Sequence, residues 1–173
     1  ILAQWREGPD DGWPSWAFEN HDAPRALSRW WNAAERPAAA RMKLLLLAAL
    51  RGNIILYQGE ELGLTQVDIP FEQLHDPEAI ANWPQTLSRD GARTPMPWDS
   101  TAHGGFSTTT PWLPLGAGNA ARHVAAQLGD AGSLLHWTRQ LLAARAASPA
   151  LRSGTLALEP ADEGQLVFTR SAP

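Results

Sequence analysis

Residues 20–22 place an amide, an imidazole and a carboxylate side by side, one residue after the apolar run of residues 16–18. Strand-like runs that end in an ordinary turn usually close on Gly, Pro or a single Asn. Three adjacent polar groups, one an acid and one an imidazole, therefore indicate a strand end that contacts a ligand. In the structural alternative, Asn20 and Asp22 only form a turn and cap the next helix.

A second group of carboxylates, Glu60 and Glu61, follows the β-branched run of residues 53–57. In parallel α/β folds, ligands bind at the carboxyl ends of the strands. The two polar groups therefore predict a site where two neighbouring strands end.

The segment of residues 89–99 combines charges, aromatic rings and prolines, which indicates a stiff and functional loop. In a structural interpretation of this loop, Arg93 pairs with Asp90 or Asp99 and only stiffens it.

The composition is that of a globular protein, since 44% of the 173 residues are hydrophobic and 18% are charged. Nine tryptophans are present. A tryptophan offers an apolar face and one N–H donor, which suit the surface of a sugar. For any single tryptophan, however, burial in a core is the default expectation.

Several partners are disfavoured. The net charge is -4 without a basic run, which argues against nucleic acid. The longest apolar stretch, residues 44–50, is too short for a membrane helix. The absence of cysteine excludes thiolate sites and suits the cytoplasm, with the periplasm as the alternative. We expect no cofactor and no metal, because four histidines show no ligand spacing: His75, His103, His123 and His136.

The candidate residues require two successive strand–loop–helix units. The patterns predict a strand over residues 15–18, a short helix over residues 25–31 and a strand over residues 54–57. Between them, a helix over residues 37–50 begins on a proline and is stopped by Gly52.

The second half of the chain begins with a long loop of little periodicity, residues 62–121. A helix is predicted at residues 120–128, and another begins at Ser133 and is ended by Pro149. Two alternating runs then predict a hairpin that opens a β domain, with strands at residues 155–158 and 165–169.

Three motifs, at residues 18–22 (FENHD), 57–63 (YQGEELG) and 89–98 (RDGARTPMPW), resemble those of the α-glucosidases of the α-amylase superfamily, glycoside hydrolase family thirteen. Residues 67–84 are similar to bacterial exo-acting α-glucosidases and oligo-1,6-glucosidases. The similarity covers nearly the whole chain, and three motifs in this order are far more specific than residues 20–22 alone.

The resemblance implies an α/β fold, a (β/α)8 TIM barrel followed by an all-β domain. Residues 15–18 would be the seventh strand and residues 54–57 the eighth. A complete barrel needs about 250 residues, so the chain would hold only its last quarter. Residues 1–150 would be the C-terminal part of the catalytic barrel, and residues 151–173 the start of the C-terminal β-sandwich.

The resemblance also implies a retaining glycosidase, which uses two carboxyl groups about 5 Å apart. Local reasoning would pair Asp22 with Glu60 or Glu61. In the family, however, the nucleophilic aspartate and the acid glutamate lie on the fourth and fifth strands. The fragment alone is therefore expected to be inactive, and Glu60 and Glu61 are expected to be structural.

Residue by residue, the resemblance makes Asp22 the transition-state stabiliser, which also binds the 2- and 3-hydroxyls of the sugar. His21 would donate to the same hydroxyls, and Arg93 would hold the 4-hydroxyl of the non-reducing glucose. Asn20 is expected to support the loop.

The implied function is hydrolysis of terminal non-reducing α-linked glucose from maltose- or isomaltose-type oligosaccharides or disaccharides. One alternative is a transglycosidase like trehalose synthase or sucrose isomerase. Another is a non-catalytic scaffold like the heavy subunits of amino-acid transporters, which the intact residues 20–22 and Arg93 disfavour. The choice between α-1,4 and α-1,6 linkages, a calcium site in the missing half and the oligomeric state stay open.

Overall fold

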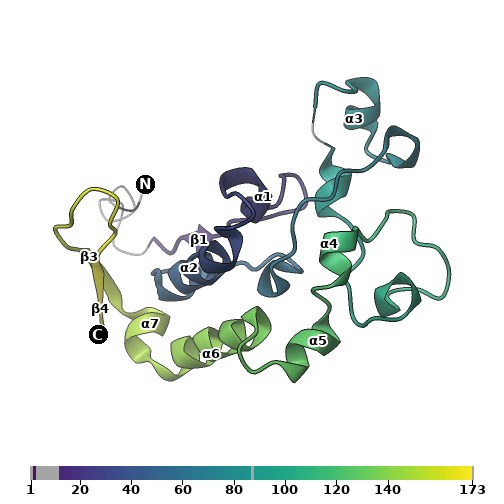
Figure 1. Ribbon diagram of the computed structural model, residues 1–173. Helices are drawn as coiled ribbons and strands as arrows, with labels where there is room; N and C mark the ends of the chain where they lie inside the picture. The colour runs from purple at the N-terminus through teal and green to yellow at the C-terminus, as the bar shows by residue number, and fades with distance from the viewer. Residues whose placement is uncertain (1, 3–11, 87, 173) are drawn as a thin grey trace.

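The computed structural model describes residue 2, residues 12–86 and residues 88–172 (Figure 1). Its two strands β1 (Ser15–Trp16) and β2 (Asn53–Ile54) form a parallel pair. Parallel pairing brings the segments that follow the two strands to the same edge of the sheet, as the sequence predicts.

Both strands are shorter than the predicted ranges of residues 15–18 and 54–57. Within the described ranges each strand has the other as its single neighbour, so few main-chain groups find a ladder partner. Beyond the paired residues, the N–H of Ile55 still donates to the carbonyl of Trp16 at 2.9 Å.

Three predicted helices are present: α1 (Ala26–Trp30), α2 (Arg36–Ala49) and α6 (Leu134–Ala147). Helix α2 has a proline in its first turn, and the N-cap hydroxyl of Ser133 accepts from the N–H of His136 at 3.3 Å at the start of α6. Helices α2 and α6 pack side by side (Figure 1). In the described part of the chain, no helix is both long and apolar enough to cross a membrane.

Gly52 is not the stop of the preceding helix, because α2 already ends at Ala49. The backbone of Gly52 instead has a φ of 126°, where a Cβ would lie 2.4 Å from the carbonyl oxygen of Pro14. Gly52 thus permits the tight turn from α2 into β2.

Two further helix boundaries differ from the prediction. The helix predicted at residues 120–128 is divided into α4 (Ala117–Ala120) and α5 (Val124–Gly129), because the ring Nδ1 of His123 caps α5 by accepting from the N–H of Ala126 at 3.0 Å. Pro149 does not merely end α6, since it begins a further helix, α7 (Pro149–Ser153).

The predicted hairpin is present. Strand β3 (Thr155–Leu158) pairs antiparallel with β4 (Phe168–Ser171), with Leu158 opposite Phe168. The second strand begins three residues later than residues 165–169 predict. The turn is therefore longer than the short one expected around Gly164.

The long loop is not structureless. Residues 67–86 and 88–115, here called the loop lobe, extend away from the helices and contain short helical turns (Figure 1). These turns are η3 (Phe71–Gln73), α3 (Pro77–Ala81), η4 (Arg89–Ala92) and η5 (Ala102–Gly105). The loop lobe has its own apolar cluster, formed by Ile69, Leu74, Ala79 and Leu113. The many prolines and glycines of this segment interrupt any regular spacing of apolar residues, so the sequence pattern does not reveal this core.

Among the described residues no tryptophan is fully buried, which differs from the default expectation, although Trp31 packs against the apolar cluster of Leu27, Ala39 and Ala40. Five described tryptophans have exposed side chains: Trp13, Trp30, Trp83, Trp98 and Trp112. Several tryptophan rings instead stack under arginines. The guanidinium of Arg29 lies 4.2 Å from the ring centre of Trp30, and such cation–π contacts form at the protein surface.

Candidate active site

The loop after β1 is shaped by Asn20. The side-chain oxygen of Asn20 accepts from the N–H of Asp22 at 2.8 Å and from that of Ala23 at 3.0 Å. This turn agrees with the loop-supporting role expected for Asn20. It leaves the side chains of His21 and Asp22 exposed, by 65% and 55%.

The structure brings the three predicted site residues together. The Arg93 Nη2 donates to Asp22 Oδ1 at 2.9 Å, and the Arg93 Nε donates to the main-chain carbonyl of His21 at 2.8 Å. The imidazole Nε2 of His21 lies 3.3 Å from Asp22 Oδ2. Both carboxylate oxygens of Asp22 thus face nitrogen groups, although more than half of the side chain remains accessible to a ligand.

The loop-stiffening alternative for Arg93 does not describe this geometry. The carboxylate of Asp90 is buried and accepts from the main-chain N–H groups of His75 and Asp76, at 2.7 and 2.8 Å. The carboxylate of Asp99 accepts from the N–H of Thr101 at 2.8 Å. The side-chain hydrogen bonds of Arg93 go to the loop after β1.

The turn η4 places Arg93, which follows it as the C-cap residue. A close approach of chain segments holds this turn: a Cβ on Gly91 would lie 2.2 Å from the carbonyl oxygen of Val67 and 2.3 Å from Nε2 of Gln66. Only glycine fits here without displacing these groups.

Arg89 is a further cation at the site, which the sequence did not single out beyond its place in the third motif. The Arg89 Nη1 lies 3.8 Å from Asp22 Oδ1, while its Nε donates to the buried carboxylate of Asp76 at 2.9 Å. The hydrogen bonds from Arg89 hold the pKa of Asp76 well below its ordinary value. Arg89 therefore connects the loop lobe to Asp22.

Glu60 does not join Asp22 in a catalytic pair. Its carboxylate is buried, accepts from the main-chain N–H of Tyr57 at 3.1 Å and lies 2.6 Å from the ammonium of Lys43. Burial raises the pKa of Glu60, and the Lys43 charge opposes this rise. Burial also raises the pKa of Glu61. The structural interpretation thus describes Glu60 better than the local pairing does.

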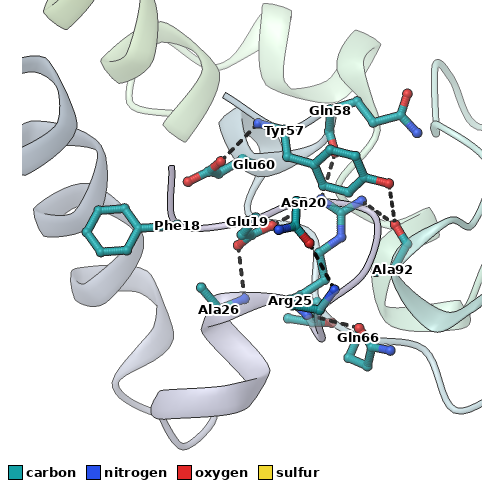
Figure 2. A network of polar contacts seen from close by, with 12 residues as sticks. Phe18, Glu19, Asn20, Arg25, Ala26, Tyr57, Gln58, Glu60, Gln66 and Ala92 are labelled. Atoms are coloured by element: carbon teal, nitrogen blue, oxygen red, sulfur yellow. Dashed lines mark hydrogen bonds and ion pairs between the residues drawn. The ribbon is translucent and has the colours of Figure 1, made fainter. Parts of the chain in front are cut away.

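Four charged residues form a buried quartet beneath the loop: Glu19, Arg25, Lys43 and Glu60. The Lys43 Nζ also lies 2.9 Å from Glu19 Oε1, and the Arg25 Nη1 lies 3.1 Å from Glu19 Oε2. Figure 2 shows Glu19, Arg25 and Glu60 in this network. The quartet was not identified from the sequence. The feature that could have indicated it is Lys43, a lysine inside the apolar run of α2.

The arrangement of Asp22, His21 and Arg93 suits the recognition of neighbouring hydroxyl groups. A carboxylate accepts from two hydroxyls at once, and a guanidinium donates in a fixed fork. An exposed negative charge can also stabilise a cation that develops on a bound ligand. Within the described ranges, no three His, Asp or Glu side chains are grouped so that they could hold a metal ion.

Comparison with known proteins finds the same family across the chain. The family model of the alpha amylase catalytic domain matches residues 1–154. A probable alpha-glucosidase of Rhizobium meliloti (strain 1021) is 43% identical over 99% of this chain and 31% of the relative. An oligo-1,6-glucosidase of Heyndrickxia coagulans is 34% identical over 98% of this chain and 34% of the relative.

Solved structures agree with this assignment. The alpha-glucosyl transfer enzyme XgtA matches with a TM-score of 0.94 at 46% identity, over 99% of this chain and 32% of that protein. The trehalulose synthase MutB, as its A258V mutant, matches with a TM-score of 0.80 at 29% identity, over 94% of this chain and 33% of that protein. The chain thus spans about a third of the length of its relatives. It has the fold of part of the (β/α)8 barrel of these enzymes, and it belongs to the α-amylase family.

Proposed function

We propose that this chain is the C-terminal part of the catalytic barrel of a retaining, exo-acting α-glucosidase. The substrate would be an oligosaccharide or disaccharide of the maltose or isomaltose type, from which the enzyme releases the terminal non-reducing glucose. The observation that supports this most is the hydrogen bond of Asp22 with Arg93, beside His21 and after a parallel strand.

In this proposal, β1 and β2 are the seventh and eighth barrel strands. Residues 1–150 belong to the barrel, and residues 151–173 begin a C-terminal β domain. The antiparallel pairing of β3 with β4 and the family match that ends at residue 154 support this division.

The three residues act on one glucose unit. Asp22 accepts from the 2- and 3-hydroxyls, and its charge stabilises the oxocarbenium-like transition state. His21 donates to the same hydroxyls. Arg93 binds the 4-hydroxyl, which closes the pocket beyond one glucose and makes the enzyme exo-acting. The nucleophile and the general acid come from other strands of the barrel.

Transfer of the glucosyl group to a sugar is the second candidate function. The similarity to the alpha-glucosyl transfer enzyme XgtA, at 46% identity, favours it. Hydrolysis and transfer share the same glucosyl-enzyme intermediate and differ only in whether water or a sugar hydroxyl attacks it.

The test is to incubate the full-length protein with maltose and, separately, with isomaltose, and to follow the anomeric protons by NMR. A retaining α-glucosidase releases α-glucose first, and a transferase forms longer or isomerised saccharides instead. A mock preparation from host cells that lack the gene is the control for contaminating glucosidase. If neither sugar is consumed at a rate above that of this preparation, the proposed function is wrong.

A further inference from the structure

Arg25 binds three segments of the site from beneath. Its buried guanidinium donates to the carboxylate of Glu19 at 3.1 Å, to the carbonyl of Gln58 at 2.7 Å and to the carbonyl of Ala92 at 3.2 Å. Glu19 belongs to the loop after β1, Gln58 follows β2, and Ala92 directly precedes Arg93. One side chain thus connects both strand ends with the turn that carries Arg93 (Figure 2).

Tyr57 reinforces the contact at Ala92. The Tyr57 hydroxyl donates to the carbonyl of Ala92 at 3.1 Å, and the guanidinium of Arg25 lies 4.5 Å from the centre of the Tyr57 ring. The peptide group before Arg93 therefore receives two donors from different directions. Figure 2 shows Tyr57 and Arg25 reaching this carbonyl from different positions.

The buried quartet compensates the charge of Arg25, since two acids and two bases leave no net charge. Burying ion pairs costs desolvation energy, and apolar residues of similar size often give equal stability. The Arg25 Nε is even buried without a hydrogen-bond partner in the described part of the chain. A gain in stability is thus a poor reason for burying these four charges. A better reason is that Arg25 holds Glu19, Gln58 and Ala92 in fixed positions.

We propose that Arg25 is a positioning residue for the active site: it sets the separation of Asp22 and Arg93 by holding the loop after β1 and the carbonyl of Ala92 on one guanidinium. The inference rests on the proposed function for its effect on catalysis. A lysine would keep the charge but could not reach all three acceptors, because it lacks the planar fork.

Arg25→Lys in the full-length protein tests this, with Arg145→Lys as the matched control. Arg145 also binds main-chain carbonyls beside β2, at the opposite end of that strand. It donates to Ala48 at 2.7 Å, to Leu50 at 2.9 Å and to Gly52. Each arginine binds three acceptors, but Arg25 is also ion-paired with Glu19, and only Arg25 lies under the site.

The kinetic readout is the split between kcat and KM, measured well below the melting temperature of each variant. Displacement of a catalytic group by about 1 Å can cost up to about 100-fold in rate. Arg25→Lys should lower kcat for maltose at least about tenfold and weaken a cationic imino-sugar inhibitor to a similar degree. Arg145→Lys should change both by less than about twofold, even where its melting temperature falls equally.

Amide hydrogen exchange gives a readout that needs no activity. The N–H of Arg93 donates to the carbonyl of Asp90 at 2.9 Å, and that of Ala26 donates to Glu19 at 3.2 Å. Arg25→Lys should accelerate exchange at both amides. Arg145→Lys should instead accelerate exchange at Asn53, because Arg145 binds the carbonyl of Gly52 in the same peptide group.

The outcomes separate the two proposals. Unchanged kcat and unchanged exchange in Arg25→Lys, or equal loss of kcat in Arg145→Lys, would overturn the positioning role. If Arg25→Lys does not fold, Arg25→Gln combined with Glu19→Gln removes one cation and one anion of the quartet and leaves Lys43 paired with Glu60. This double variant should lower kcat and accelerate exchange at Arg93, and no change in both would overturn the role. If the parent protein consumes no glucoside, the proposed function fails, and exchange at Arg93 and Ala26 still decides the positioning.

Discussion

Replacing Asp22 by asparagine separates a catalytic role from a structural one. The amide keeps the shape and one acceptor oxygen but loses the negative charge. Turn formation depends on Asn20, whose oxygen accepts from the N–H of Asp22, so the loop should survive the change. Asparagine is also as good a turn former as aspartate.

The structure bounds the loss of stability. The side chain of Asp22 is 55% exposed, and its partner Arg93 is 30% exposed. Ion pairs this accessible to solvent contribute about 0–1 kcal/mol to folding. The melting temperature of the full-length protein should therefore fall by a few degrees at most.

The catalytic loss should be much larger. Removal of one preorganised electrostatic group at a developing charge costs about 3–4 kcal/mol, a decrease in kcat of roughly 100- to 1000-fold. This loss of transition-state stabilisation is far larger than the free energy of folding, about 0–1 kcal/mol, that the exposed ion pair contributes. The comparison of kcat with stability therefore distinguishes the two roles.

The assay measures melting temperature and kcat for maltose on the same preparation. Asp99→Asn is the matched control, since Asp99 also lies in a loop and accepts from a nearby N–H, that of Thr101. It should retain kcat. An Asp22→Asn protein that is stable and turns over at nearly the parental rate would refute the catalytic role of Asp22.

Three further predictions follow from the site. Arg93→Lys should lower kcat/KM for maltose at least tenfold, about 1.4 kcal/mol, because lysine lacks the fork; unchanged kinetics would return Arg93 to a structural role. Hydrogen bonds from Arg89 keep the pKa of Asp76 below its ordinary value of 3.8, so the pair stabilises the fold above that pH and loses this contribution as the pH falls through the lowered pKa. Asp76→Asn should therefore lower the melting temperature at pH 7, and the difference from the parent should shrink below about pH 4; a difference independent of pH would contradict this. Residues 1–173 expressed alone should not hydrolyse a nitrophenyl α-glucoside, because we propose that the nucleophile comes from another strand of the barrel; turnover by a preparation free of host glucosidase would argue against that placement.

Local signals predicted much of the fold. Ser133 caps α6, and the proline near the start of α2 lies in its first turn. Such signals act within a few residues and can be recognised in a sequence. The division of the helix predicted at residues 120–128 could not be foreseen, because it depends on which tautomer and rotamer His123 adopts as a cap.

The buried quartet illustrates what the sequence could not supply. Lys43 lies inside an apolar stretch of α2, but its partners Glu19 and Glu60 lie 24 and 17 positions away. No periodicity connects residues at such separations. In contrast, the resemblance assigned Asp22 and Arg93 to one glucose, and the two side chains lie within hydrogen-bonding distance.

The separate apolar cluster of the loop lobe bears on how independently the two parts of this chain can vary. Mutations in clusters that share no contacts tend to be additive, so substitutions around Ile69 and Leu113 should combine with changes in the barrel helices without epistasis. Among the described residues, two ion pairs join the loop lobe to the loop after β1. They connect Arg89 and Arg93 with Asp22. A library that varies only the residues around Ile69 and Leu113 should therefore leave the positions of Arg89, Arg93 and Asp22 unchanged.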